Sequence, residues 1–254
     1  PVTAHRQSAP GRTCMAVARS AARRCAWGAL GASRPLAFPL HYAFHKPAGF
    51  SSQPNQPVPG AVSVWDLFEQ ALRRLGGAPP GACTRRLSLI GRLDLATSGL
   101  VVFSNYRPMH LALCSPGAQL QKRYRAICAG RLWDGDERLA SLRAPLAMVV
   151  RSPKGGSTDV LTRPAGARVV RRWRDPVPPG APPSAGDLTE IEVAISEGRN
   201  RQIRRLFARA GLSLRGLHRV AVGPVLLGEL PVGRARALSS SEARAIFGAV
   251  ADDC

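Results

Sequence analysis

The chain has 254 residues, of which 36 are lysine or arginine and 16 are aspartate or glutamate, for a formal net charge of +20. This length suits one domain or two small ones and is enough for a substantial core. The excess of positive charge indicates a polyanionic partner, with nucleic acid first and an anionic membrane surface second. A solvated basic surface stays open as an alternative, because almost all of the positive charge is arginine, with Lys46, Lys122 and Lys154 as the lysines.

The cysteines and the hydropathy argue against two other classes of protein. The 6 cysteines, at positions 14, 25, 83, 114, 128 and 254, form no C-x-x-C pair, and no group of His and Cys has the spacing of a zinc site. We therefore expect reduced thiols in an intracellular compartment and no metal. No apolar run is long enough to span a bilayer, so we expect no membrane insertion.

Residues 1 to 40 differ in composition from the rest of the chain. They hold six arginines, many alanines and no carboxylate, since the first acidic residue is Asp66. This composition is typical of an organellar transit peptide, and the segment lacks a sustained apolar period. A disordered basic tail of another origin is the alternative. We expect a leader over 1–40 and one folded domain over 41–254.

The first half of that domain is predicted to alternate short strands with helices. A strand over 40–50 ends in a Pro-Gly turn. A helix over 63–75 is predicted because its apolar residues share one face and Ser63 and Asp66 have capping-box spacing. Two strands, RLSLIG and GLVVFSN, flank the turn GRLDLATS. The stretch YRPMHLALC predicts a short helix with Pro108 in its first turn, and KRYRAICAG predicts a strand.

In the second half, residues 151–187 are rich in Pro, Gly and Arg and predict an irregular exposed loop. Its Trp173 is interpreted as a half-buried anchor, with base stacking as the alternative. A strand follows over 188–195, and then a helix that Asn200 would cap and Gly211 would end. Further strands are expected in LRGLHRVAVGPVLL, and a last helix opens at SSSEARAIF. Many strands, few helices and no regular βαβ alternation indicate the α+β class with a mixed or antiparallel sheet and flanking helices.

Asp94, in the turn GRLDLATS, is the first candidate for chemistry. Most aspartates near Gly and Ser form turns or cap helices, and that role stays open. Nearby arginines such as Arg92 would keep the carboxylate ionised, and an ionised carboxylate can act as a nucleophile or base at a sugar carbon. The sequence offers no second carboxylate in a comparable setting, which argues against ordinary glycoside hydrolysis.

Tyr124 is the second candidate, because it lies among Lys122, Arg123 and Arg125. A tyrosine there can stack on a base while the cations hold phosphates. Packing of a strand tyrosine on the core is the equally weighted alternative.

The segment EGRNRQIRRLFARAG is the third candidate site. Arg201, Arg205 and Arg209 are spaced by four, and a helix N-terminus already favours anions. A solvated basic face is the alternative. Arg204 follows the buried-phase Ile203, so it is predicted to point inward, where it needs an acidic partner. Asp94 is the partner that we expect.

Five motifs in this order resemble those of one enzyme family. GRLDLATSGLVVFSN resembles the catalytic-aspartate motif of RNA pseudouridine synthases, and HKPAGFSSQ is similar to their Lys-Pro-x-G motif. QKRYRAICAG is similar to their K-x-Y strand. EGRNRQIRRLF and LHRVAVGPVLLGELPVGRARALSSSE resemble the signature and tail of the subgroup named for the ribosomal small-subunit enzyme RsuA. The resemblance covers about residues 41 to 247.

The resemblance implies isomerisation of a specific uridine in ribosomal RNA to pseudouridine, without a cofactor, on a flipped-out base. It implies that Asp94 acts at the ribose C1′, that Tyr124 stacks under the base and takes the C5 proton, and that Arg204 pairs with Asp94. Other basic residues at motif positions are expected to bind RNA. These are Lys46, Arg92, Lys122, Arg199, Arg201, Arg205 and Arg219.

Departures from the family pattern indicate which branch of the family the chain resembles most. Residues 1–40 are too short for the S4 RNA-binding module that many members carry, so the chain looks closest to the S4-less branch of the large-subunit enzyme RluE. With a transit-like leader, we expect a monomeric enzyme of a plastid or mitochondrion, and otherwise a cytoplasmic one. Two alternatives stay open: a catalytically inactive factor that binds ribosomal RNA, and a synthase that acts on transfer RNA.

Overall fold

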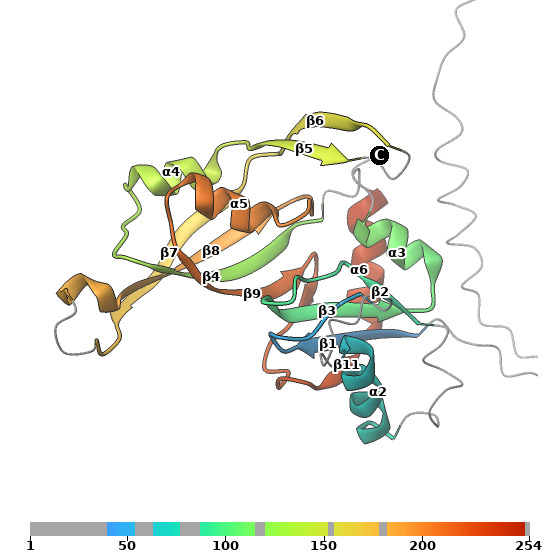
Figure 1. Ribbon diagram of the computed structural model, residues 1–254. Coiled ribbons are helices and arrows are strands. Elements are labelled where there is room, and N and C mark those ends of the chain that lie inside the picture. Colours follow the sequence, from blue (N-terminus) through green and yellow to red (C-terminus); the bar gives the residue numbers. More distant parts are fainter. Residues whose placement is uncertain are drawn as a thin grey trace, which may run out of the picture.

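The computed structural model describes residues 40–53, 63–76, 87–114, 120–151, 155–177 and 182–251. They form an α+β fold around a nine-stranded sheet with the strand order β11-β1-β3-β9-β4-β8-β7, in which β2 pairs with β3 and β10 with β9 (Figure 1). The strand pairings are antiparallel except that of β3 with β9. The predicted fold class and mixed sheet are therefore confirmed. The leader expected over 1–40 lies almost entirely outside the described residues.

One half of the sheet carries helices on both faces. It contains β1 (His41–Lys46), β2 (Ser88–Ile90), β3 (Ser98–Ser104) and β11 (Ala235–Ala237). Alternate residues of β1 and β3 point to opposite faces, as the pleat requires. Phe44 and Phe103 pack with α2 (Val64–Arg74), whereas Ala43 and Leu100 pack with α3 (Arg107–Cys114) and α6 (Ser240–Ala251).

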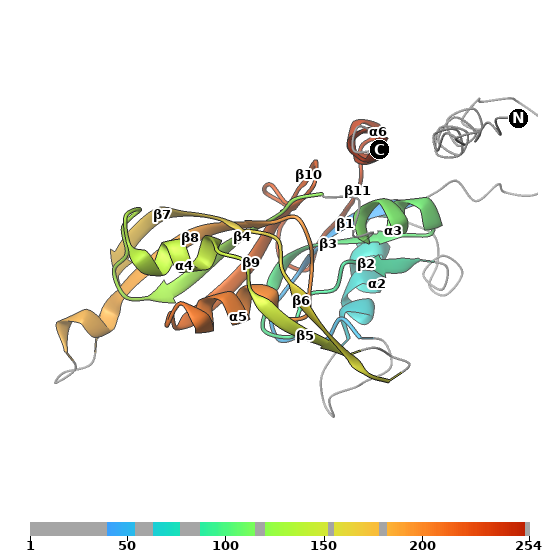
Figure 2. The ribbon, with the colours of Figure 1, turned by 90° about the horizontal axis from the view of Figure 1, so that it is seen from above.

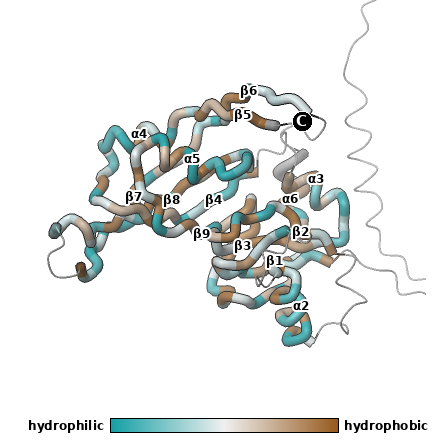
Figure 3. Tube along the Cα trace, viewed as in Figure 1, coloured by the Kyte–Doolittle hydropathy of each residue, from teal (hydrophilic) through white to brown (hydrophobic). Residues whose placement is uncertain are grey.

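The other half contains β4 (Lys122–Ala129), β8 (Asp187–Ile195) and β7 (Gly166–Arg174). It is joined to the first half by β9 (Leu214–Val222), which pairs with both β3 and β4, and the short β10 (Val225–Leu226) pairs with β9. Helices α4 (Glu137–Arg143) and α5 (Gln202–Arg209) pack beside each other on this half. Figures 1 and 2 show α4 and α5 together at one end and α2, α3 and α6 around the other. The hydropathy colouring shows apolar segments along the strands between them (Figure 3).

The N-cap residues predicted from the sequence are correct for two helices and wrong for a third. Ser63 and Asp66 form the predicted capping box of α2. Ser239 and Glu242 exchange the same two hydrogen bonds, of 2.8 and 3.1 Å, at α6. The predicted cap at Asn200 is wrong, since α5 begins one residue later and Arg201 is its N-cap without a side-chain hydrogen bond.

The loop predicted over 151–187 is also wrong, because most of its described residues form strands. The hairpin of β5 (Ala147–Arg151) and β6 (Ser157–Leu161) stands apart from the main sheet (Figure 1). Next, β7 pairs with β8 along its length, with a short 3-10 turn at Pro183–Gly186 before β8. Arg168 and Arg171 lie over Glu192 and Glu190 of β8, at 2.8 and 2.5 Å. These cross-strand ion pairs compensate for the weak strand signal of an arginine-rich segment.

Trp173 on β7 is half-buried, as the favoured interpretation predicted. Its ring lies 4.8 Å from the Arg171 guanidinium and its indole N–H donates to Asp175 at 3.0 Å. Both the ring face and the polar edge of this residue are thus used within the protein.

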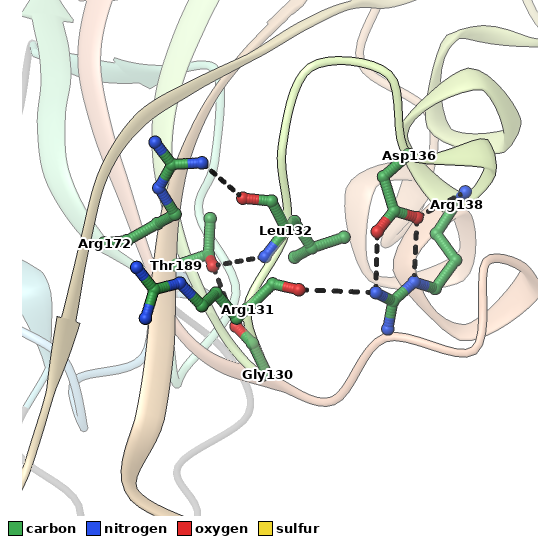
Figure 4. A network of polar contacts seen from close by, with 7 residues as sticks. All are labelled: Gly130, Arg131, Leu132, Asp136, Arg138, Arg172 and Thr189. Carbon is green, nitrogen blue, oxygen red and sulfur yellow. Dashed lines mark hydrogen bonds and ion pairs between the residues drawn. The ribbon is translucent and has the colours of Figure 1, made fainter. Parts of the chain in front are cut away.

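A buried threonine fixes the loop between β4 and α4. The Thr189 hydroxyl donates to the Gly130 carbonyl at 2.8 Å and accepts from the Leu132 amide at 3.1 Å. Figure 4 shows this centre between two arginines that donate to the carbonyls of the same loop, Arg172 to Leu132 and Arg138 to Arg131. The loop is therefore tied to both β7 and β8.

The pairing of β3 with β9 brings two backbones unusually close. Ser98 pairs with His218 and Gly99 with Arg219, and Gly99 has a φ of 110°. A Cβ at Gly99 would lie 2.3 Å from the Arg219 carbonyl oxygen. Only glycine fits this junction, both for its φ and for the space.

We predict that Gly99→Ala destabilises the protein by about 4 kcal/mol or more, because backbone rather than a flexible side chain blocks the new methyl group. Gly130→Ala is the matched control, since Gly130 has a φ of 95° but nothing lies within 4 Å of the position that its Cβ would take. It should cost only about 1–2 kcal/mol. Urea unfolding of both variants measures the difference, and equal losses would contradict a steric origin.

Candidate functional site

A cavity of about 770 Å³ opens where the two halves of the sheet meet. It is lined by the loop after β2, by β4 and by the start of α5, among other segments. Eight of the ten predicted site residues line it: Asp94, Tyr124, Arg204, Arg92, Lys122, Arg199, Arg201 and Arg219. The other two, Lys46 and Arg205, do not. The structure thus brings together residues of four motifs that lie far apart in the sequence.

Asp94 is held between two guanidinium groups. Its Oδ2 lies 3.3 Å from Arg204 Nε and 4.0 Å from Arg201 Nη1. The side chain keeps 31% of its surface exposed. The contact between Asp94 and Arg204 expected from the sequence is therefore present, across 110 residues of chain.

Arg204 also fixes the loop that carries Asp94. Its Nη2 donates to the Ala96 carbonyl and to the Thr97 hydroxyl, each at 3.1 Å. Within the loop the Thr97 amide donates to the Asp94 carbonyl at 3.0 Å. Arg204 thus orients both the carboxylate and its backbone, as a forked guanidinium can and an ammonium cannot.

Arg201 reaches Asp94 from a left-handed backbone conformation. Its φ is 52°, the one positive value found among described residues other than glycine. The turn before α5 is held by two residues that the sequence reasoning missed, Glu197 and Gln202. Glu197 accepts from the Arg163 amide at 2.8 Å, from Gln202 Nε2 at 3.1 Å and from Arg199 Nε at 3.0 Å. Both lie in the motif EGRNRQ, and Gln202 also lines the cavity, but membership in a motif does not show which residues hold the turn.

Tyr124 packs on the core, as one of the two interpretations predicted, and its stacking on a base stays a prediction. It is 7% exposed and belongs to the same core cluster as Ile203 and Phe207 of α5, yet it also lines the cavity. Lys122, two residues earlier on the same face of β4, lines the cavity too. Burial lowers the pKa of Lys122, and the charge of Arg219 adds to the effect. An anion entering the cavity would reverse this penalty.

Lys46 and Arg219 are placed differently from the RNA contacts that were predicted. Lys46 has no exposed surface and Arg219 has 2%. The hydrogen bonds of both side chains go to backbone carbonyls, mostly of the segment that carries Asp94. Lys46 lies outside the cavity lining, whereas Arg219 belongs to the lining with almost all of its surface covered, so neither is placed as an exposed phosphate contact.

The remaining predicted cations differ in exposure. Arg92 is exposed at the cavity, whereas Arg199 is half-buried and its Nε is paired with Glu197. Arg205 is exposed on α5 and lies outside the cavity lining. Residues missed on the other wall are Ser51, Ser52 and Gln53, which follow the Lys-Pro-x-G motif. The buried Ser52 hydroxyl has no hydrogen-bond partner among the residues that the structure describes.

Within the described residues, no group of three or more His, Cys, Asp or Glu side chains is placed to hold a metal ion. Cys114 and Cys128 are free thiols, of which Cys114 is exposed. The helices in the same parts of the chain include none long and apolar enough to cross a membrane.

The chemistry that this arrangement permits is narrow. One carboxylate, oriented by two guanidinium groups, faces a cavity with a tyrosine in its wall and cations around it. Such a site can present an ionised carboxylate to a sugar carbon of an anionic ligand. The cavity volume lies in the range that holds a nucleotide-sized ligand.

Comparison with known proteins agrees with this chemistry. The family model described as RNA pseudouridylate synthase matches residues 41–209, which contain Asp94, Tyr124 and Arg204. The chain therefore belongs to the RNA pseudouridylate synthase family.

Individual relatives are similar over most of this chain. A putative chloroplastic ribosomal large subunit pseudouridine synthase of Arabidopsis thaliana is 28% identical over 209 residues, which are 82% of this chain and 45% of the relative. An uncharacterised RNA pseudouridine synthase of Mycobacterium tuberculosis is 29% identical over 83% of this chain and 70% of its own length. Ribosomal large subunit pseudouridine synthase B of Escherichia coli O157:H7 is 27% identical over 73% of this chain and 52% of its own. The chain thus spans about half the length of two of these relatives.

A solved structure titled as a pseudouridylate synthase superposes with a TM-score of 0.60 at 22% identity, over 82% of this chain and 74% of the other. At this identity the likeness establishes the shared fold. It agrees with the mixed sheet and flanking helices described above.

We predict that Arg201→Gly stabilises the protein by about 0.5–1 kcal/mol, because glycine relieves a left-handed conformation that costs other residues about 1–2 kcal/mol. Arg205→Gly is the control, since it lies inside α5 and should lose about 1 kcal/mol as glycine does in a helix. Changes of the same sign in thermal or urea unfolding would show that the turn is not strained.

Proposed function

We propose that this chain isomerises a specific uridine in ribosomal RNA to pseudouridine and that Asp94, Tyr124 and Arg204 carry the reaction. The observation that supports this most is the Asp94–Arg204 contact of 3.3 Å at the wall of a cavity that Tyr124 also lines, inside the segment that matches the family. A uridine within a helix cannot reach such a cavity, so the base must be flipped out.

In the proposed mechanism the ionised Asp94 carboxylate acts at the ribose C1′. The bond between C1′ and N1 breaks, the uracil rotates, and a bond between C1′ and C5 forms. C5 loses its proton, for which Tyr124 is the proposed acceptor, and N1 gains one, so that no oxidant or cofactor is consumed. Arg204 pairs with the carboxylate and orients it toward the cavity, and Arg92, Lys122, Arg199 and Arg201 hold the RNA phosphates.

Ribosomal RNA is the proposed substrate because two relatives of this chain are named as ribosomal large subunit enzymes. The Arabidopsis relative is described as chloroplastic, which also supports a plastid location, and the arginine-rich and carboxylate-free composition of residues 1–40 fits a leader. We propose a catalytic domain over 41–254 that acts as a monomer. The assignment to the S4-less RluE-like branch stays a prediction.

A chemical map of pseudouridine across all RNA of the source cells tests the function. Cells that lack the protein should lose one site in ribosomal RNA, and wild type but not Asp94→Asn should restore it. Loss of a site in transfer RNA instead would show that the substrate is transfer RNA and would leave the proposed reaction unchanged. Restoration by Asp94→Asn would remove Asp94 from the reaction, and an unchanged map would favour an inactive RNA-binding factor.

We predict that Arg204→Ala lowers the rate of pseudouridine formation by roughly 10²-fold, because the carboxylate loses both its charge partner and its orientation. Arg209→Ala is the control. Arg209 also lies on α5 but donates to carbonyls at the end of α4, including that of Ala144 at 2.8 Å, so its loss should change the rate less than about threefold. Equal effects in a purified assay would contradict the role given to Arg204.

We also predict that deletion of residues 1–38 leaves the purified enzyme active, because the family match begins at residue 41. The measurement is product formation with the truncated and the full chain at equal concentration. Loss of the folded circular dichroism signal on truncation would show that these residues belong to the domain.

A further inference from the structure

Two buried cations converge on the segment that carries Asp94. Lys46 Nζ lies within hydrogen-bond distance of four backbone carbonyls, of Pro47 at 3.0 Å, Asp94 at 3.3 Å, Leu95 at 3.4 Å and Thr97 at 2.8 Å. Arg219 Nε donates to the Leu100 carbonyl at 2.7 Å and its Nη2 to the Gly91 carbonyl at 2.6 Å. Apart from Pro47, all of these acceptors belong to residues 91–100.

Burying these two cations costs folding free energy. A buried cation is ordinarily paired with a carboxylate, yet among the described residues neither of these two has a salt bridge. The two charges also oppose each other. Burial lowers the pKa of Lys46 to about 8, with the charge of Arg219 adding to the shift and that of Asp94 opposing it. An apolar pair of similar volume would avoid these costs.

The positions of these carbonyls explain why Lys46 and Arg219 are buried beside the Asp94 loop. The segment 91–97 is an irregular loop between β2 and β3, so no sheet ladder fixes the backbone there. Arg219 binds the carbonyls of Gly91, at the start of the loop, and of Leu100 in β3. Lys46 binds the carbonyls of Asp94, Leu95 and Thr97. The loop is thus fixed from its buried side by cations, whereas Arg204 fixes the carboxylate from the cavity side.

We propose that Lys46 and Arg219 form a clamp that positions the Asp94 loop for catalysis, and that this, rather than the binding of RNA phosphates, is their role. They are positioning residues, because they act through the loop backbone and do not touch the reacting atoms. The kinetic part of this inference rests on the proposed function. The structural part, loss of order in residues 91–100 when the clamp is removed, does not.

The test compares Lys46→Met and Arg219→Met with Arg209→Met. Arg209 is the matched control because it too donates to several backbone carbonyls, of Ser141, Ala144 and Pro145, but at the end of α4 rather than in the Asp94 loop. Hydrogen exchange of the full chain without RNA, read by mass spectrometry, should speed up over residues 91–100 in the first two variants. The amides of Thr97 and Gly49 are the sensitive reporters, since they donate to the carbonyls of Asp94 and Leu95. Arg209→Met should leave these amides unchanged and speed exchange around residues 141–145.

Kinetics on an RNA substrate then separate a positioning role from RNA contact. The clamp variants should lose roughly 10²-fold in kcat, as a small misplacement of a reacting group can cause, with KM and the Kd for RNA within about threefold of wild type. Arg219→Lys keeps the charge but not the two-pronged reach, so it should still lose kcat and keep its Kd. This variant also serves where a methionine variant fails to fold.

Three results would overturn the clamp. The first is unchanged exchange over 91–100 in folded Lys46→Met and Arg219→Met. The second is a weakened Kd with kcat preserved, which would restore the role in RNA contact. The third is an equal loss of kcat in Arg209→Met, which would reduce the effect to stability. If wild type itself makes no pseudouridine, the proposed function fails, while the exchange experiment still decides whether the clamp exists.

Discussion

The parallel pairing of β3 with β9 is the constraint on which the site depends. Parallel strands begin at the same edge of a sheet, so the segments that precede them arrive side by side. Asp94 lies in the loop just before β3, and Arg204 lies on α5, the helix just before β9. Their contact across 110 residues follows from this one pairing. The pairing in turn requires Gly99, because no Cβ fits between the two backbones.

The distribution of charge follows from the same geometry. A chain with a net charge of +20 has few carboxylates to place, and several of the described ones lie where arginines need them. Glu190 and Glu192 tie β7 to β8 through exposed arginines, and such surface pairs individually contribute little. Asp94 instead lies between Arg201 and Arg204 and stays open to the cavity. Lys46 and Arg219 add buried charges beside it. Charges placed in this way lower the stability of the fold and hold the site in one conformation, as is common where activity and stability compete.

Elements with strong local signals were predictable, and those built from long-range contacts were not. The helix α2 follows from its apolar face and its capping box, and β8 from its alternation, because both signals lie within a dozen residues. The strands β5 and β6 were missed because each has only five residues, and β7 because its arginines obscure any alternation. Pairing with partner strands supplies what the local sequence lacks. Asn200 carries the side chain of a helix cap, but the Glu197–Gln202 hydrogen bond holds a turn that starts α5 one residue later.

The sequence by itself determined the family and predicted the contact between Asp94 and Arg204. Asp94 and Arg204 stand in motifs whose chemistry is readable from residue type, and an inward arginine in a basic chain needs a carboxylate. Tertiary structure alone decided which of the cations are exposed at the cavity and which are buried against the carbonyls of the Asp94 loop. Lys46 and Arg92 both lie in recognisable basic motifs, yet one is fully buried against loop carbonyls and the other is exposed. The physical reason is that a cation's role depends on whether water, phosphate or a carbonyl surrounds it, and that environment is built by strands far away in the chain.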